Sequence, residues 1–458
     1  MGLADLLTRD DWIYTGILGS SFAISWLLRS SQNMGLIRHG GGLIGFMMAL
    51  LILRWKIFYS IPLVVFTMLS IKLVDQRLLT KIVFVVTFVY LLVCRYLHFV
   101  FPIEELASQA NGLQLIMTLR VIGLSFEISD SRVARSKPKS DDTKVKRHLL
   151  HDPSLSEMFN YFYHYCGLFT GPYYTFQMLL DSQEPVLITS WSPLNEIKQR
   201  GLQLLWSVPL FVITNKLFPL DHLRSDAIWE WSFTYRLFWA AAVFVVFRNR
   251  VYSAWAVSES ICVTIGIGIY PKLSKPTIVV GPTDVEKYQS LHGRTETEYS
   301  SEAITNLDIG EVEFSDGFRS GIRAWNRSVQ SWLALFVYSR TSRTYRVEVT
   351  MFVSALWHGT YAGYFMSFLV VPMCTAVEDV IFKQFANAKP KWFQWLYILT
   401  LRSRGFDFLA TGFLLKNFAD THRFWSSLYY WLPISLAPIY VISKVIMIIF
   451  PPPKRVVS

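Results

Sequence analysis

The residue best suited to chemistry is His358, which lies in the stretch from Val349 to Val377, where no Asp, Glu, Lys or Arg occurs. At about 1.5 Å of helix rise per residue, His358 would lie roughly 14 Å into a membrane, near its middle. An ionisable side chain at that depth usually serves a function. A neutral imidazole can accept a proton through one nitrogen while a partner holds the other, so the stretch predicts a general base. A histidine that only packs against its neighbours is the alternative that the stretch alone leaves open.

A second polar side chain, Asn326, precedes this stretch. Around it, apolar residues recur at intervals of three and four, which predicts an amphipathic helix with Asn326 on its apolar face. The apolar positions are Ile322, Trp325, Val329, Trp332, Leu333 and Phe336. A carboxamide on that face must be hydrogen-bonded or must wait for a substrate.

Two other interpretations of Asn326 are open at this point. The triplet Asn326-Arg327-Ser328 is an N-x-Ser glycosylation sequon. A glycan needs a surface loop, and the amphipathic pattern argues against one. The second interpretation is an asparagine that only packs between helices.

The elements that hold these residues are expected to be membrane helices. Of the 458 residues, 52% are hydrophobic and only 17% are charged, whereas soluble domains contain about a quarter of charged residues. The charges are clustered and leave long neutral stretches between them. These expected spans are Trp12 to Leu28, His39 to Leu53, Ile57 to Ile71, Ile82 to Cys94, Met158 to Leu180, Gly201 to Asn215, Val349 to Val377 and Phe424 to Ser443.

Several of these stretches are shorter than the roughly 20 apolar residues that a bilayer requires. Such helices must break or pack against protein, and interrupted backbone at membrane depth is tolerated only where it is packed or lines a cavity. We therefore predict an all-α polytopic membrane protein of about ten or eleven transmembrane helices, with short interfacial helices, that enclose a chamber. Residues 1–458 are expected to form one domain with polar loops at 129–153, 181–200 and 272–323.

The net charge of +11 does not indicate a nucleic-acid partner. The basic residues flank apolar segments, and the densest run, Arg132 to Arg147, lies between two expected spans, which is typical of a cytosolic loop that faces anionic headgroups. No metal site is expected, because the histidines and cysteines match no ligand spacing, and the cysteines are interpreted as packed thiols. They are Cys94, Cys166, Cys262 and Cys374.

Two motifs resemble those of a known family. The first contains Trp325-Asn326, Val329-Gln330 and Trp332-Leu333, and the second contains Ser354, Trp357-His358-Gly359 and Gly363-Tyr364. Together they resemble the paired Asn and His signature of the membrane-bound O-acyltransferases. The turn from Gly167 to Pro172 is similar to an element of the phospholipid-remodelling members.

The resemblance is closest to the lysophosphatidylinositol and lysophospholipid acyltransferase branch. Sterol and diacylglycerol acyltransferases of the wider family carry an acidic motif before the Asn, whereas Phe318 to Asn326 contains no acid. The resemblance implies transfer of an acyl group from a fatty acyl-CoA to the free hydroxyl of a lysophospholipid, with lysophosphatidylinositol as the expected acceptor. It also implies the endoplasmic reticulum membrane as the location.

In this chemistry His358 would be the general base, and Asn326 would orient the hydroxyl or stabilise the oxyanion. Transfer would be direct, with acyl-CoA as a co-substrate and no permanently bound cofactor. The expected substrate-binding residues beside the pair are Trp325, Trp332, Ser354, Trp357, Gly359 and Tyr364. Phosphates of CoA or of a headgroup call for arginines. The candidates are Arg323, Arg343 and Arg346, and further Arg319, Arg327 and Arg340.

Alternatives from other classes are also compatible with the sequence. The acceptor could be another lysophospholipid, a protein or a peptide. Broken short spans and a histidine at mid-membrane also suit a proton-coupled transporter. A transporter is expected to show internal symmetry between its halves, and the sequence shows no such repeat.

Overall fold

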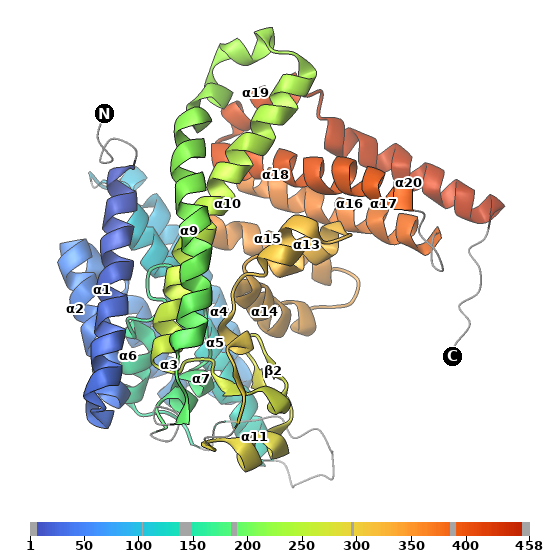
Figure 1. Cartoon of the computed structure of the whole chain (residues 1–458). Coiled ribbons are helices and arrows are strands. Elements are labelled where there is room, and N and C mark those ends of the chain that lie inside the picture. The colour runs from blue at the N-terminus through green and yellow to red at the C-terminus, as the bar shows by residue number, and fades with distance from the viewer. Residues whose placement is uncertain are drawn as a thin grey trace. The chain divides into compact units, whose positions relative to one another are not determined.

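The computed structural model describes residues 7–102, 104–136, 149, 151–184, 190–294, 297–384 and 391–450. Helices dominate these residues (Figure 1), and the strands among them form two short antiparallel pairs. β1 (Tyr270–Pro271) pairs with β4 (Tyr299–Ser300), and β2 (Pro276–Thr277) pairs with β3 (Gly281–Pro282). The predicted all-α fold class is confirmed.

Six helical segments in the described ranges are long and apolar enough to cross a membrane. They are Leu36–Tyr59, Gln76–Val100, Ser108–Ser136, Leu194–Arg224, Ala362–Lys383 and Trp431–Ile449. The first expected span forms α1 (Arg9–Ser31), a complete helix whose serines and glycines lower its mean hydropathy below that of these six. The protein is thus a polytopic membrane protein. The expected total of about ten or eleven spans exceeds these six and stays a prediction.

The chain forms two compact units. Unit 1 comprises Met1–Leu205, Tyr252–Asn306 and Asn326–Trp332. Unit 2 comprises Trp206–Val251, Leu307–Trp325 and Leu333–Ser458. Helices with residues in both units are α9 (Leu194–Leu217), α10 (Phe233–Thr264) and α14 (Arg327–Phe336). Short 3₁₀ or π segments are Leu36–Gly40, Arg54–Tyr59, Leu220–Arg224, Asp226–Glu230, Lys272–Ser274, Glu302–Ile304, Tyr338–Arg340 and Ile398–Arg402.

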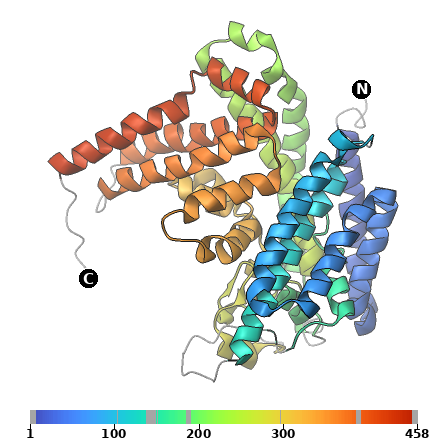
Figure 2. The same ribbon diagram turned by 180° about the vertical axis from the view of Figure 1, so that it is seen from behind.

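Unit 1 is built from pairs of closely packed helices. Besides α1, its helices are α2 (Gly41–Leu53), α3 (Ile61–Leu73), α4 (Gln76–Val100), α5 (Ser108–Ser136), α6 (Leu155–Tyr163), α7 (Phe176–Ser182) and α11 (Val285–Leu291). The light-blue α4 lies alongside the cyan α5 (Figure 2), and α2 packs on α6. Glycine permits the second contact, because a Cβ at Gly45 would lie 1.9 Å from the carbonyl oxygen of Tyr163. A side chain there would force the two helices apart.

The expected span from Met158 to Leu180 is wrong, because the helix stops early. Helix α6 ends at Tyr163, and α7 begins only at Phe176. Between them the backbone takes positive φ at Gly167 (+67°) and Gly171 (+77°), values that favour glycine over residues with a Cβ. The apolar character of the stretch indicated its burial correctly but did not reveal the backbone break.

The break is stabilised by Arg120, a fully buried arginine in the middle of α5. Carbonyl groups that are left without helix partners need donors when they are buried. Arg120 donates to the carbonyl oxygens of Tyr161, Phe162, His164 and Cys166 at 2.6 to 3.1 Å, and to the hydroxyl of Tyr174 at 3.0 Å. One guanidinium therefore satisfies four carbonyl groups at the end of α6 and the start of the turn.

Replacement of Arg120 with methionine is expected to destabilise the protein strongly. Methionine retains the length of the side chain, but the carbonyls of the turn lose their common donor, at a cost of about 3 kcal/mol or more. Thermal unfolding in detergent measures this as a lower Tm. The matched control is Arg77→Met, because Arg77 is exposed. Equal Tm values for the two variants would contradict the role of Arg120.

The described part of the basic run is not a free solvated loop. Arg132 and Arg135 form ion pairs with Asp152 at 2.6 and 2.5 Å. Partial burial raises the pKa of the Asp152 carboxyl, but the two arginines more than offset this effect and hold that pKa below its ordinary value. Residues 137–147 of the run lie outside the described residues.

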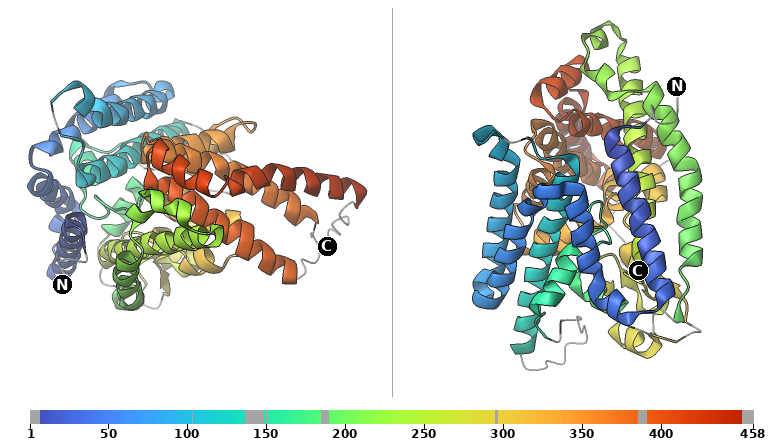
Figure 3. Two further views of the ribbon diagram at one scale, coloured as in Figure 1. Left: turned by 90° about the horizontal axis from the view of Figure 1, so that it is seen from above. Right: turned by 90° about the vertical axis from the view of Figure 1, so that its left-hand side faces the viewer.

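Unit 2 is organised around α16 (Ala362–Gln384). Its other helices are α12 (Ile309–Phe314), α13 (Phe318–Ala324), α15 (Arg346–His358), α17 (Lys391–Tyr397), α18 (Ser403–Leu415), α19 (Phe418–Ser427) and α20 (Trp431–Ile449). The orange and red helices α16, α18 and α20 lie side by side (Figure 3), and α15 also packs on α16. The core of this unit includes Val377 of α16, Phe408 of α18 and Leu436 of α20, together with Trp239 of α10 and Trp425 of α19.

Gly363 brings two helices of unit 2 together. A Cβ on Gly363 would lie 2.2 Å from the carbonyl oxygen of Gly412, so only glycine allows α16 and α18 this approach. The expected span from Phe424 to Ser443 is interrupted, since α19 ends at Ser427 and α20 begins at Trp431.

Candidate active site

Asn326 lies at a break between two short helices. Helix α13 ends at Ala324, and α14 begins at Arg327. Asn326 has φ of +49°, in the left-handed region, where asparagine is tolerated better than most residues other than glycine. The expected continuous amphipathic helix is therefore wrong at this point. Apolar periodicity reports which side chains are buried, and it continued across the break because both short helices bury one face.

The side chain of Asn326 is only half-buried. Among the described residues, none forms a hydrogen bond to its carboxamide, whereas its carbonyl oxygen accepts the N–H of Gln330 at 3.0 Å. Backbone in a sparsely populated conformation occurs preferentially at functional sites, where neighbouring structure holds it in place. The carboxamide is thus carried by a constrained backbone, and within the described ranges it has no hydrogen bond that a substrate would need to displace.

Residue Asn306 holds the start of α14. Its carbonyl oxygen accepts the N–H of Arg327 at 2.8 Å, and its Oδ1 accepts the N–H of Ser328 at 2.9 Å. These are the first two N–H groups of the helix, which have no partners within the helix. Asn306 is itself fully buried, and its own N–H donates to Glu259 at 2.9 Å.

His358 is the last residue of α15. The helix does not continue through the expected span to Val377, because the chain turns at Gly359 and resumes as α16 at Ala362. This correction places His358 at a helix end with only part of its side chain buried. Because the chain turns next to it, the imidazole is more accessible to other molecules than it would be within a continuous helix.

Aromatic rings surround the imidazole of His358 within unit 2. The ring of Phe368 is stacked on it at 5.2 Å, and that of Phe413 lies edge-on at 5.0 Å. Trp357 and Tyr364 contribute rings at 4.7 and 6.0 Å. These rings restrict the rotation of the imidazole, and their apolar surfaces suit an acyl chain better than a polar solute.

Several expected substrate-binding residues therefore lie around His358. Trp357 and Tyr364 are in ring contact with it, and Ser354 is buried one turn earlier in α15. A Cβ on Gly359 would lie 2.7 Å from the ring of Tyr364, so glycine lets that ring close over the turn. The structure brings these residues together in unit 2.

The two tryptophans next to Asn326 have different surroundings. The ring of Trp325, in unit 2, packs against Phe244 and Phe247 at 6.4 and 6.0 Å. The indole of Trp332, in unit 1, is buried, and its Nε1 donates to the carbonyl oxygen of Leu119 at 3.1 Å. Because Trp332 is buried and tied to the backbone, it anchors α14 within unit 1.

The candidate arginines divide into paired and exposed ones. Arg319 forms an ion pair with Asp379 at 2.6 Å, and Arg327 forms one with Glu302. Arg346 lies over the ring of Tyr338 at 4.4 Å. Arg340 donates through Nε to the carbonyl oxygen of Leu335 at 3.2 Å, and the side chains of Arg323 and Arg343 are exposed. Exposed arginines are better placed for phosphates than those that already have a carboxylate partner.

Asn326 belongs to unit 1 and His358 to unit 2. The polar residues behind Asn326, namely Asn306, Glu259 and Arg200, were not predicted from the sequence. One signal was present: Glu259 is an ionisable residue next to the apolar stretch from Ile261 to Val263. Like His358, Glu259 is an ionisable residue among uncharged neighbours, and such a residue in a membrane protein usually serves a function.

Comparisons with known proteins agree with these motifs. The model of the membrane-bound O-acyltransferase family matches residues 46–417, which include both Asn326 and His358. A membrane-bound acylglycerophosphatidylinositol O-acyltransferase of Caenorhabditis elegans is 56% identical over 444 residues, which are 96% of this chain and 96% of the relative. Proteins of the same description from Danio rerio and Homo sapiens are 34% and 32% identical, over 93% of this chain and 91% of each relative.

Proposed function

Because this chain belongs to the membrane-bound O-acyltransferase family, we propose that it transfers a fatty acyl group from acyl-CoA to the free hydroxyl of lysophosphatidylinositol. The proposed acceptor is supported by one observation. The chain is 56% identical, over 96% of both chains, to a protein described as an acylglycerophosphatidylinositol O-acyltransferase. Family membership supports an enzyme that acts in a membrane. The donor, the inositol headgroup and residence in the endoplasmic reticulum are parts of the proposal.

In the proposed mechanism His358 is the general base. Its imidazole takes the proton from the lysolipid hydroxyl as the oxygen attacks the thioester carbonyl. When the tetrahedral intermediate collapses, the C–S bond breaks, and the imidazolium returns the proton to the CoA sulfur. The position of His358 at the end of α15 supports this role. The carbonyl-rich end of a helix stabilises a positive charge by about 0.3–1 kcal/mol.

Asn326 is proposed to act on the reacting oxygens. Its carboxamide either donates to the oxyanion that develops on the thioester carbonyl or orients the attacking hydroxyl. The left-handed backbone and the carboxamide without a bond to a described residue support such a role. Transfer is proposed to be direct, so no covalent acyl-enzyme forms. The exposed arginines Arg323 and Arg343 are the favoured partners for phosphates of the donor or acceptor.

The test is acyl transfer by the purified full-length protein in detergent. The donors are saturated, monounsaturated and polyunsaturated acyl-CoAs, and the acceptors are lysophospholipids with inositol, choline, ethanolamine or serine headgroups and an unrelated peptide. Release of the CoA thiol and the mass of the product lipid are measured. We expect kcat/KM to be at least about tenfold higher with the inositol headgroup than with the others.

Each result has a definite meaning. Release with another headgroup but not with inositol would overturn the acceptor assignment. Acylation of the peptide alone would support the alternative of a peptide acceptor. If folded protein released CoA with no acceptor of the panel, acyl transfer to a lysolipid would be wrong.

A further inference from the structure

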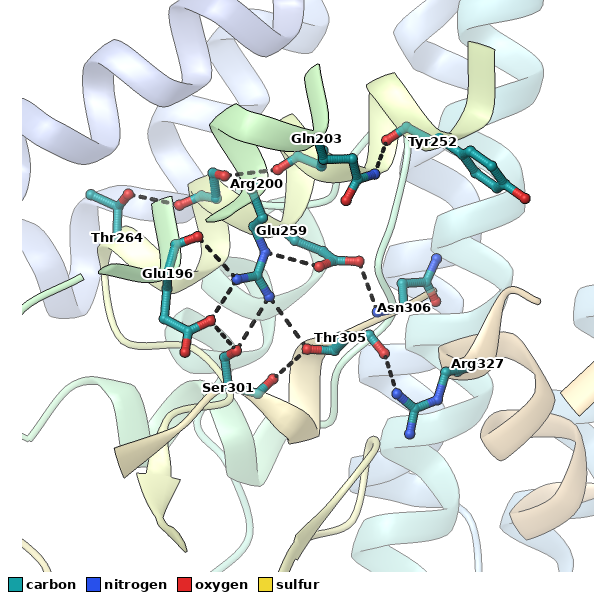
Figure 4. Close-up of polar contacts among 12 residues, drawn as sticks. Glu196, Arg200, Gln203, Tyr252, Glu259, Thr264, Ser301, Thr305, Asn306 and Arg327 are labelled. Atoms are coloured by element: carbon teal, nitrogen blue, oxygen red, sulfur yellow. Dashed lines mark hydrogen bonds and ion pairs between the residues drawn. The ribbon is translucent and has the colours of Figure 1, made fainter. Parts of the chain in front are cut away.

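We infer that Asn306 is a positioning residue for Asn326 and that the buried pair of Glu259 and Arg200 holds Asn306 in place. The inference rests on the proposed function, because it assigns Asn306 a task through the carboxamide of Asn326. It adds a set of residues that neither motif contains. Their side chains come from α9, from α10 and from the segment before α12 (Figure 4).

Asn306 constrains the backbone immediately after Asn326. Two consecutive N–H groups, of Arg327 and Ser328, are bonded to this one residue at 2.8 and 2.9 Å. Bonds to both its carbonyl oxygen and its side chain fix the orientation of the peptide planes that follow Asn326. A residue with φ of +49° needs such constraints, because nearby right-handed conformations are lower in energy.

Glu259 constrains Asn306 in turn. Its Oε1 accepts the N–H of Asn306 at 2.9 Å, and its Oε2 accepts the Nε of Arg200 at 2.9 Å. Glu259 and Arg200 are 5% and 7% exposed, so water does not screen this ion pair appreciably. A buried carboxylate whose oxygens are both bonded is held rigidly, and truncation of Arg200 would remove the ion-pair partner of the buried Glu259.

Arg200 connects the pair to α9 and to the residues just before Asn306. Its Nη1 donates to Glu196 at 2.7 Å, and its Nη2 donates to Ser301 and Thr305 at 3.3 Å each. The carbonyl oxygen of Thr305 also accepts Arg327 Nη1 at 3.3 Å. Figure 4 shows these bonds converging on the segment that ends at Asn306. The network thus runs without interruption from Glu196 to the first residue of α14.

A purely structural network would lower stability when it is cut but would leave the turnover of folded enzyme unchanged. A positioning network lowers kcat of the folded enzyme, since displacement of a catalytic group by about 1 Å can cost 10²-fold. It leaves KM nearly unchanged, because the contact that is lost stabilises the transition state more than the bound substrates. The test therefore measures kcat and KM separately, per folded molecule, with acyl-CoA and lysophosphatidylinositol.

The principal variant is Asn306→Ala, for which we expect kcat to fall about 30- to 100-fold with KM changed less than about threefold. Asn306→Asp retains an acceptor oxygen for the N–H of Ser328, at a helix N-terminus that favours an acid, and is expected to recover at least about tenfold of that loss. A kcat for Asn306→Ala within about twofold of wild type would overturn the inference.

The matched control is Asn160→Ala. Asn160 is also a buried asparagine of unit 1, and its Oδ1 accepts the N–H of Gly42 at 2.7 Å at the start of α2. Its removal is expected to lower Tm but not the kcat of the folded enzyme. An equal loss of kcat in both variants would mean that general loosening, not positioning of Asn326, causes the effect.

If Asn306→Ala does not fold, Glu259→Gln takes its place, because the glutamine oxygen can still accept the N–H of Asn306. We expect a smaller loss of kcat, about three- to tenfold, as the bond to Arg200 weakens. An unchanged kcat in folded Glu259→Gln would overturn the role of the Glu259 and Arg200 pair.

A double variant separates this inference from the proposed function. If Asn306 acts through Asn326, adding Asn306→Ala to Asn326→Gly causes no further loss of kcat, whereas independent effects would multiply and overturn the inference. Full activity of Asn326→Gly alone would defeat the proposed role of Asn326 and the inference with it. An inactive Asn326→Gly beside a fully active Asn306→Ala would defeat only the inference.

Discussion

Replacement of His358 with alanine is expected to lower kcat by about 10²- to 10⁴-fold, the contribution typical of a positioned general base. The imidazole is partly accessible at the end of α15, and four aromatic rings limit its orientations. His358→Gln is expected to be as inactive as His358→Ala, because its amide retains polarity and much of the volume but cannot take a proton. CoA release with lysophosphatidylinositol measures both variants.

A second histidine in unit 2 serves as the control. The ring of His422 is stacked on Phe418 at 5.5 Å, so His422, like His358, has an aromatic neighbour, but it is exposed in the middle of α19. His422→Ala is expected to retain kcat within about threefold. Activity of folded His358→Ala close to that of wild type would refute the general base. Trapping of a covalent acyl-enzyme in wild type would refute direct transfer.

The second large effect is expected at Asn326, where backbone and side chain can be tested separately. Glycine adopts positive φ without strain, so Asn326→Gly removes the carboxamide and keeps the left-handed turn. We expect kcat to fall about 10²- to 10³-fold, as for loss of an oxyanion donor, with little change in Tm. Asn326→Ala is expected to lose a similar factor and also about 1 kcal/mol of stability, because alanine is strained at this φ.

Asn326→Asp distinguishes the two roles proposed for the carboxamide. Aspartate also tolerates positive φ, but its ionised side chain only accepts hydrogen bonds. An inactive Asn326→Asp would indicate donation to the oxyanion, whereas an active one would indicate that the oxygen orients the hydroxyl. The control is Gln32→Gly, because Gln32 has φ of +51° at an exposed helix end in the same unit. If Asn326→Gly and Gln32→Gly were both fully active, Asn326 would have only a backbone role.

The helical membrane character of the protein followed from local properties that are written in the sequence. Neutral stretches, clustered charge and the scarcity of charged residues depend on composition alone. His358 and Asn326 were selected for a similar reason, since a polar side chain in an apolar pattern is visible without knowledge of the fold. The family motifs around them are also contiguous, and the match over residues 46–417 confirms the family.

Helix ends were predicted less well, because apolar periodicity does not depend on backbone continuity. The spans from Met158 to Leu180 and from Val349 to Val377 both contain turns, at positions where glycine or a buried donor permits them. Arg120 illustrates the difficulty. Its carbonyl partners lie about 40 to 50 positions later in the chain, so no local window contains both sides of the contact.

The sequence by itself determined that Asn326 is polar and lies among apolar residues, and only the tertiary structure decided that it occupies a left-handed break held by Asn306. Asn306 lies in a segment that the sequence marked only as a polar loop. Its partner Glu259 belongs to a different helix, α10. The conformation of Asn326 depends on hydrogen bonds between residues distant in the chain, and such bonds exist only after the helices have packed.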